Sequence, residues 1–338
     1  MGESLSGGSP TFYFCRDRML LYAVRRLLWS IPVLLIASIL VFVAVKASTD
    51  PAASLRRPGV TAADVQRFRS ELHLDDSSFE QYKTWITDFV HGDLGHNLRN
   101  KDVWPDLRDA MIVTLQLGLY AYILTVTFGV TIGIFSAVKQ YSWFDTLSTG
   151  TSFFGLSIPP FFFGLMLQII MVLKFKDWFG STPFYTSGVN NTTETGLGYD
   201  RLIHLTLPAL TVAVQGIAIY SRYMRASMLD VLSSDYLRTA RAKGLSERRV
   251  IVKHALRNAL IPVVTYSAID IGAIIGGLVI TEYIFGINGM GRYFLQSFSD
   301  GEYVNILPWM MIVVFSVILF NLVADLLYGV LDPRIRLD

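Results

Sequence analysis

The sequence contains few charged residues for its length. Only 17% of the 338 residues are Asp, Glu, Lys or Arg, whereas 52% are hydrophobic, and soluble domains carry about 25% charged residues. So few charges cannot cover a water-facing surface, which argues against a soluble enzyme of one or two domains. The net charge of +2 is too close to zero to indicate a nucleic-acid-binding protein. Together with a mean hydropathy of +0.44, these deficits indicate a polytopic membrane protein.

Cysteine and the common catalytic motifs are equally scarce. The single cysteine, Cys15, cannot form an internal disulfide, and there is no C-x-x-C pair for zinc or redox chemistry. No G-x-x-x-x-G-K-[ST] phosphate loop occurs, so this chain is not expected to hydrolyse ATP. H-E-x-x-H, G-x-S-x-G and a paired-carboxylate arrangement are also missing. We therefore expect no catalytic residue, metal ligand or cofactor in this chain, and a membrane-embedded enzyme is disfavoured.

Six apolar stretches are long enough to cross a membrane. A span needs about 20 mostly apolar residues because the hydrocarbon core is about 30 Å thick. Backbone groups find no water there, so uninterrupted apolar runs predict helices. The predicted spans are residues 27–45, 111–138, 147–173, 203–220, 259–281 and 306–331. We expect an all-α fold with about six transmembrane helices.

These spans divide the chain into segments. The predicted segments are an N-terminal cytoplasmic tail (1–19), a first transmembrane helix (20–47), an extracytoplasmic segment (48–108), a five-helix core (109–331) with a cytoplasmic loop (222–258), and a C-terminal tail (332–338). A cleaved signal peptide is the alternative for the first span, because Arg25 and Arg26 precede it. Its 19-residue apolar run exceeds the usual signal core of about 7–15 residues, which favours a membrane helix.

Lysine and arginine are concentrated on one side of the predicted membrane. With six spans, both termini and the loops 139–146 and 222–258 share a side, and nine basic residues lie between Arg222 and Arg257 alone. The short loops on the opposite side contain only four basic residues, Lys174, Lys176, Arg201 and Arg292. By the positive-inside rule, we expect a multi-pass protein of the inner or plasma membrane with both termini in the cytoplasm.

The loop 222–258 contains the pattern of a short capped helix. Ser234 is a typical N-cap, Asp235 suits the first turn, and Gly244 can end the helix in left-handed conformation. Ser246 followed by Glu247 is typical of a second helix start. The helix suits insertion into a groove of a partner, while its cations alone would equally suit a loop held against anionic headgroups.

The same loop resembles a known family segment. Residues 235–245 (DYLRTARAKGL) and 254–262 (HALRNALIP) resemble the EAA loop of ABC importer permeases, in the version of the dipeptide/oligopeptide permease family. Arg238 stands at the Glu position of the general EAA consensus, and Arg257 at its terminal Pro position. Both departures are typical of the peptide branch of this family, and they favour it over sugar or amino-acid importers.

Four further segments agree with this resemblance. They are the GDLG run (92–95), LSIPPF (156–161), the segment 281–292 with its GMGR run, and NLVADLLYGVLDPRIR (321–336). Their order and spacing cover nearly the whole chain from about residue 20. The chain is thus identified as resembling a permease subunit with type I ABC importer architecture.

The resemblance implies partners and a function. It implies a second homologous permease subunit, two cytoplasmic ATPase subunits or domains that bind ATP and Mg, an extracytoplasmic substrate-binding protein, and a di- or oligopeptide cargo. Relatives that carry nickel, haem or glutathione leave the cargo open. An ion-coupled secondary transporter is a further alternative, but Asp270 is the single acidic residue well inside a predicted span, and such transporters usually carry intramembrane charges.

The resemblance and the residue types give three sets of candidate site residues. The ATPase-coupling loop is predicted to use Ala240, Arg241, Lys243, Gly244 and Leu245. The translocation path is predicted to include Gln215, Ser267 and Asp270. The outer gate is predicted to include Glu282, paired with Arg292.

Overall fold

The computed structural model describes residues 10–48, 61–71, 73–97, 100–189 and 198–331. These residues fold into helices and connecting turns, and their only β-type pairing is an isolated bridge between His96 and Asp102. The predicted all-α fold is therefore confirmed. The first nine residues of the predicted N-terminal tail and the whole predicted C-terminal tail (332–338) lie outside the described residues.

Four long helices are apolar enough to cross a membrane. They are α1 (Pro10–Ser48, apolar from Val24), α4 (Val103–Val138), α8 (Tyr199–Leu232) and α15 (Tyr303–Leu331). Two bent helix pairs satisfy the same test, which gives six spans when each pair is counted as one. This count agrees with the sequence, which predicts about six transmembrane helices. Helix α1 begins at Pro10, within the segment predicted to be a tail, so the first helix is longer than predicted.

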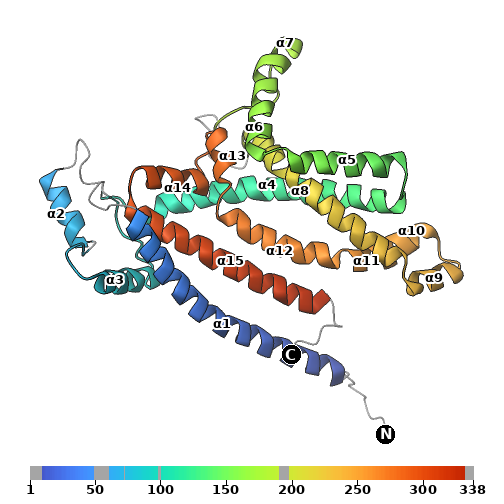
Figure 1. Ribbon diagram of the computed structural model, residues 1–338, viewed down its shortest axis with the longest axis horizontal. Coiled ribbons are helices and arrows are strands. Elements are labelled where there is room, and N and C mark those ends of the chain that lie inside the picture. Colours follow the sequence, from blue (N-terminus) through green and yellow to red (C-terminus); the bar gives the residue numbers. More distant parts are fainter. Residues whose placement is uncertain (1–9, 49–60, 72, 98–99, 190–197, 332–338) are drawn as a thin grey trace, which may run out of the picture.

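The third predicted span is broken in its middle. Helix α5 (Trp143–Ser157) ends at an extended Ile158, and α6 (Pro160–Ile169) leads through a π-helical turn (Ile170–Phe175) into α7 (Lys176–Phe179). The two halves meet at 98°, so α6 begins beside α8 and α13 (Val279–Ile284) and α7 projects away from the other helices (Figure 1). The break agrees with the Pro159–Pro160 pair in the sequence, because prolines lack amide donors and hold the preceding residue extended.

The fifth predicted span is also bent. Its first half consists of α10 (Glu247–Arg249), a π-helical turn (Val250–Ala255) and α11 (Leu256–Ala259), which meet α12 (Ile261–Ile275) at 45°. Helix α12 stops six residues before the predicted end, and a separate short helix, α13 (Val279–Ile284), follows. Gly277 makes the turn between them with φ of +90°, where a Cβ would lie 2.5 Å from the amide nitrogen of Gly291.

Helix α8 extends further than the fourth predicted span. It reaches Leu232, so residues 222–232, predicted to lie in the cytoplasmic loop, belong to the helix. The rest of that loop contains α9 (Asp235–Ala242) and α10. Helix α8 runs beside α4 along much of its length (Figure 1), and Gly133 of α4 makes this possible because a Cβ there would lie 2.6 Å from the Met224 side chain.

The predicted extracytoplasmic segment contains two small helices, α2 (Ala62–Glu71) and α3 (Ser78–Val90). Helix α3 packs on the end of α1 through an aromatic cluster, in which Tyr82 meets Phe42 edge to face at 5.5 Å and donates or accepts a 2.7 Å hydrogen bond with Ser38. Helix α14 (Met290–Ser299) lies at the same end of the molecule (Figure 1). This end is opposite to the one that carries α9 and α10.

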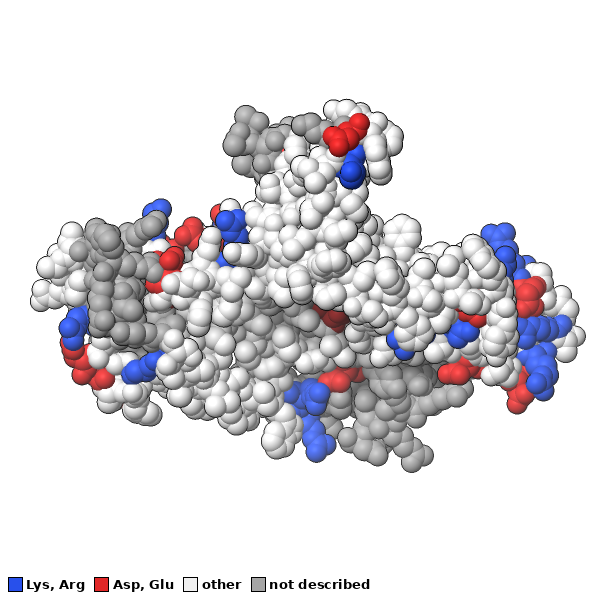
Figure 2. All heavy atoms as spheres, turned by 45° about the horizontal axis from the view of Figure 1, so that its top comes forward, with Lys and Arg blue, Asp and Glu red and all other residues white. Residues whose placement is uncertain are grey.

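Charged side chains gather chiefly at these two ends. Figure 2 shows Lys, Arg, Asp and Glu at either end of the visible face, with smaller groups at its upper and lower edges and mostly uncharged residues between them. Large apolar side chains of α1, including Leu28 and Trp29, are more than half exposed. An exposed apolar belt between two polar ends is the surface that a bilayer requires.

Candidate coupling and gate sites

The two residues that the sequence predicts to bound helix α9, Ser234 and Gly244, lie at its ends, but only Gly244 plays the predicted role. Ser234 precedes it in extended conformation, although its hydroxyl donates to the Val231 carbonyl and does not cap an amide. Gly244 follows it with φ of +77°, and the amide of Gly244 donates to the Arg241 carbonyl at 2.9 Å. The left-handed turn at Gly244 ends the helix and directs the chain back towards α10.

One face of α9 is buried against its own chain. Leu237 is fully buried and Ala240 is 9% exposed, and both belong to an apolar cluster with Met228, Val250 and Ala255. The Asn258 side chain also donates a 2.8 Å hydrogen bond to the Tyr236 hydroxyl. Ala240 therefore packs on its own chain, against the end of α8 and the π-helical turn Val250–Ala255, and its contact with a partner stays a prediction.

The opposite face of α9 is exposed and basic. Arg241 donates two hydrogen bonds to Glu247, of 3.2 and 3.0 Å, and these bonds raise the pKa of Arg241. Lys243 and Gly244 are exposed, and Leu245 is half-buried beside the apolar cluster. The surface that α9 and the turn after it offer outward therefore carries three cations, Arg238, Arg241 and Lys243, beside the exposed Asp235, Tyr236, Thr239 and Ala242.

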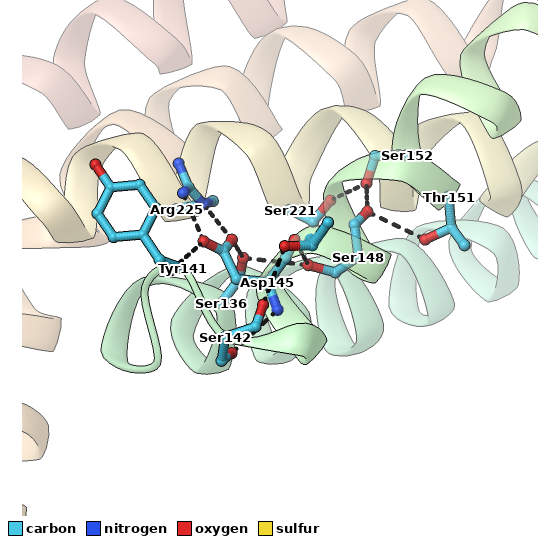
Figure 3. A network of polar contacts seen from close by, with 10 residues as sticks. Ser136, Tyr141, Ser142, Asp145, Ser148, Thr151, Ser152, Ser221 and Arg225 are labelled. Atoms are coloured by element: carbon cyan, nitrogen blue, oxygen red, sulfur yellow. Dashed lines mark hydrogen bonds and ion pairs between the residues drawn. The ribbon is translucent and has the colours of Figure 1, made fainter.

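A buried ion pair that the sequence analysis did not identify lies beside this loop. Asp145, at the start of α5, is 3% exposed and accepts two hydrogen bonds from the Arg225 guanidinium of α8, of 2.7 and 2.8 Å. The Ser136 hydroxyl and the Tyr141 amide donate to the same carboxylate. Figure 3 shows these groups converging on Asp145 from α4, the α4–α5 turn and α8.

Hydroxyl groups extend this network along α5. Ser148 donates to Ser136 at 3.2 Å, and Ser152 pairs with Ser221 of α8 at 3.1 Å (Figure 3). The network therefore fastens three helices together within about three turns of the end of α8. From the sequence, Arg225 is predicted to be one of the loop cations. Nothing in the local sequence indicates its partner, which lies 80 positions away.

The candidate path residues do not form one cluster. Asp270 of α12 accepts a 3.1 Å hydrogen bond from the Tyr220 hydroxyl of α8. Ser267, one turn away, is 7% exposed and donates to the Val263 carbonyl of its own helix. Gln215 donates to the Ile158 carbonyl at 3.2 Å, where it satisfies the backbone at the break between α5 and α6. Asp270 thus links α12 to α8 through its side chain, and Gln215 links α8 to the break after α5.

Glu282 is a fully buried carboxylate that joins several elements at the other end. It accepts hydrogen bonds from the Thr114 hydroxyl of α4 (2.6 Å) and from the amides of Leu278 (3.3 Å), Gly291 (2.8 Å) and Arg292 (3.1 Å). The last two amides open α14, so the carboxylate also meets the positive end of that helix dipole. Glu282 therefore locks α13 and α14 onto α4.

Glu282 does contact Arg292, but not through the predicted ion pair. The Arg292 backbone amide, and not its guanidinium, contacts the carboxylate. The sequence suggested a surface ion pair, whereas the group is buried among amide donors. Gly289 permits this, since a Cβ there would lie 2.5 Å from the Glu282 carboxyl carbon.

Among the described residues, no group of three or more His, Cys, Asp or Glu is placed to hold a metal ion. The candidate sites consist of helix-joining hydrogen bonds and an exposed basic helix. Such an arrangement is suited to transmitting movement between helices.

Comparison with known proteins identifies the class of protein to which this arrangement belongs. Residues 129–337 match the family "binding-protein-dependent transport system inner membrane component", and residues 19–117 match the N-terminal domain of such components. The chain therefore belongs to this family and is a permease subunit of an ABC importer. The inward-facing structure of the MetNI methionine ABC transporter has the same fold, with a TM-score of 0.52 and 14% identity over 67% of this chain and 96% of that chain.

Curated relatives cover the chain almost completely. The oligopeptide transport permease AppB of Bacillus subtilis is 41% identical over 94% of this chain and all of its own length. The dipeptide permease DppB of Escherichia coli K12 is 34% identical over 94% of this chain and 99% of its own. The glutathione permease GsiC of the same strain is 36% identical over the same shares of both chains.

Proposed function

We propose that this permease carries di- or oligopeptides into the cell, delivered by an extracytoplasmic binding protein and driven by two ATPase subunits with ATP and Mg. A second homologous permease completes the path. The choice of a peptide cargo rests on the 41% identity to an oligopeptide permease over the whole length of that relative. Closure of the ATPases moves α9, and the helices follow as rigid bodies.

Glutathione is a second candidate cargo, because the glutathione permease is about as similar to this chain as the dipeptide permease. Competition between unlabelled compounds and a labelled peptide in an uptake assay distinguishes the two candidate cargoes. Uptake of a labelled tripeptide by cells expressing the complex should be inhibited by unlabelled di- and tripeptides. Stronger inhibition by glutathione than by any unmodified peptide would reassign the cargo.

The proposed topology places α9 in the cytoplasm and α3 outside. In a Cys15→Ser background, a cysteine at Val90, which is 74% exposed on α3, should react with a membrane-impermeant thiol reagent added to intact cells. A cysteine at Ser246, exposed after Gly244, should react only after the membrane is opened. The reverse pattern would invert the topology and remove the coupling assignment.

Gly244 tests the coupling role of α9. Gly244→Val should uncouple ATP hydrolysis from uptake, because a β-branched side chain at positive φ is strained by about 1–2 kcal/mol and the turn would shift. No atom lies within 4 Å of a Cβ built at Gly244, so strain and not collision is the cause. Gly244→Asn is the matched control, since Asn tolerates this conformation, and it should retain most uptake. Equal uptake by the two variants would contradict the role.

Asp270 tests the translocation path. A carboxylate among apolar helices costs at least about 2.5–3.5 kcal/mol by insertion scales, so we infer that it faces the passing peptide and favours its amino group. Asp270→Asn keeps the shape and the bond from Tyr220. Uptake of peptides with a free amino end should fall several-fold, with ATPase assembly intact. Tyr220→Phe is the control that loses the hydrogen bond but keeps the charge. Unchanged uptake by the Asn variant would make Asp270 structural.

A further inference from the structure

A groove runs along one face of α8 in the half of the helix that leads towards α9. It has a volume of about 730 Å³, which lies within the range of about 300–1,000 Å³ that small-molecule sites occupy. Residues three or four positions apart share a face of a helix, and α8 lines the groove in this pattern with Ile219, Arg222, Tyr223 and Ala226. Phe153 of α5 and Tyr266 of α12 lie in the same wall. The groove is therefore formed where three membrane helices meet.

Arg222 is an accessible cation in this groove. It is exposed, and its guanidinium lies over the ring of Phe153, 4.9 Å from the ring centroid. Among the described residues, Arg222 has no ion pair and no hydrogen bond through its side chain. The second arginine of the wall, Arg225, is by contrast bound to Asp145 at 2.7 and 2.8 Å. Arg222 is thus the guanidinium that the groove offers to an anion from outside the chain.

Tyrosine rings connect the groove to Asp270. Tyr223 stacks on Tyr266 at 5.3 Å, Tyr266 meets Tyr220 edge to face at 5.4 Å, and the Tyr220 hydroxyl donates to Asp270 at 3.1 Å. Tyr223 lies about one turn closer to α9 along α8 than Tyr220, and Tyr266 lies about one turn closer to the start of α12 than Asp270. A carboxylate and a guanidinium therefore lie at successive levels of one aromatic surface.

We propose that this groove binds the carboxyl end of the peptide and that Arg222 pairs with the terminal carboxylate. A guanidinium can hold a carboxylate through two parallel N–H donors, and the exposed Tyr223 adds a hydroxyl. The inference rests on the proposed function, in which Asp270 favours the amino group of the same peptide. The phosphate of an anionic lipid is the poorer occupant, because a headgroup such as phosphatidylglycerol brings no ammonium for Asp270.

The test is protection of a cysteine placed in the groove. Ala226, an exposed residue of the wall, is replaced by Cys in a Cys15→Ser background. The complete complex in phosphatidylcholine nanodiscs, without ATP or binding protein, is alkylated with a thiol reagent, and labelling of this chain is followed after the subunits are separated. The probes are trialanine and its C-terminal amide, which differ only at the carboxyl end. Ser246→Cys, exposed outside the groove, is the control site and should be labelled at one rate throughout.

The expected result is protection that depends on the free carboxylate. Trialanine should protect Ala226→Cys at a concentration on the order of tenfold lower than the amide, since the amide loses a charge-assisted pair. Arg222→Gln should remove this difference by weakening trialanine alone. Arg222→Lys should keep part of it, because the charge remains but the planar fork is lost. Arg248→Gln, at an exposed cation outside the groove, should discriminate like the unmodified complex.

Two outcomes would overturn the proposal. One is equal protection by trialanine and its amide in the unmodified complex, or a difference that survives Arg222→Gln. The other is slower labelling of Ala226→Cys in nanodiscs that contain phosphatidylglycerol, with no further effect of trialanine, which would assign the groove to a lipid headgroup.

Failure of the proposed function has a different signature. In that case the unmodified complex with its binding protein would show no ATP-driven uptake of labelled trialanine, and both proposals would fall together. Intact uptake without carboxylate-dependent protection of Ala226→Cys would remove the groove assignment alone.

Discussion

Replacement of Asp145 by alanine should destabilise the permease by about 3–5 kcal/mol, because it leaves the Arg225 guanidinium without its partner in a largely buried site. The same change leaves the Ser136 hydroxyl and the Tyr141 amide without their acceptor. The loss should appear as a lower midpoint of thermal unfolding in detergent. Because Arg225 lies near the junction of α8 with α9, ATP hydrolysis should also become less dependent on substrate delivery.

Two comparisons make this prediction specific. Asp75→Ala removes an equally short but exposed ion pair, with Arg69 at 2.8 Å, and should cost at most about 1 kcal/mol. Replacing both partners, Asp145→Leu with Arg225→Met, should recover much of the loss, since paired apolar groups often substitute for a buried ion pair. An Asp145→Ala variant as stable as Asp75→Ala would show that the network does not hold the helices.

Glu282→Gln should open the α13–α14 corner. The amide keeps the shape of the carboxylate but turns one acceptor into a donor, so at least one of the four hydrogens now bound by Glu282 is left facing another hydrogen. Each unsatisfied buried group costs about 1–3 kcal/mol, more for charged groups. We expect about 3 kcal/mol in total, which is on the order of a hundredfold increase in local opening.

Hydrogen exchange measures this opening directly. The amides of Gly291 and Arg292 should exchange on the order of a hundred times faster in Glu282→Gln, whereas amides of α9 should be unaffected. Glu80→Gln, at an exposed residue of α3, is the matched control and should change neither. Unchanged protection at Gly291 would mean that Glu282 does not hold the corner, and its assignment to the outer gate would lose its basis.

The features that the sequence predicted correctly depend on short stretches of chain. Apolar runs of about 20 residues locate the spans, since the thickness of a bilayer fixes their length. The left-handed turn at Gly244 and the break at Pro159 follow from the backbone preferences of single residues. The 98° bend after that break was not predictable, because the direction of α6 is set by its packing on α8 and α13.

The features that were missed depend on residues far apart in the sequence. Asp145 and Arg225 each look like the charged end of a span, and only the packing of α4, α5 and α8 brings them together. Glu282 was found as a residue, but its amide donors come from a turn of α14 that glycines allow to approach closely.

The most direct test of the account is peptide uptake by the purified complex in proteoliposomes. The complex of both permeases and the ATPases is reconstituted with ATP on the cytoplasmic side and binding protein with labelled peptide on the other. The account predicts uptake that requires ATP and the binding protein and that is lost in Gly244→Val but kept in Gly244→Asn. Uptake by this chain without ATPase subunits, driven by an ion gradient, would contradict it.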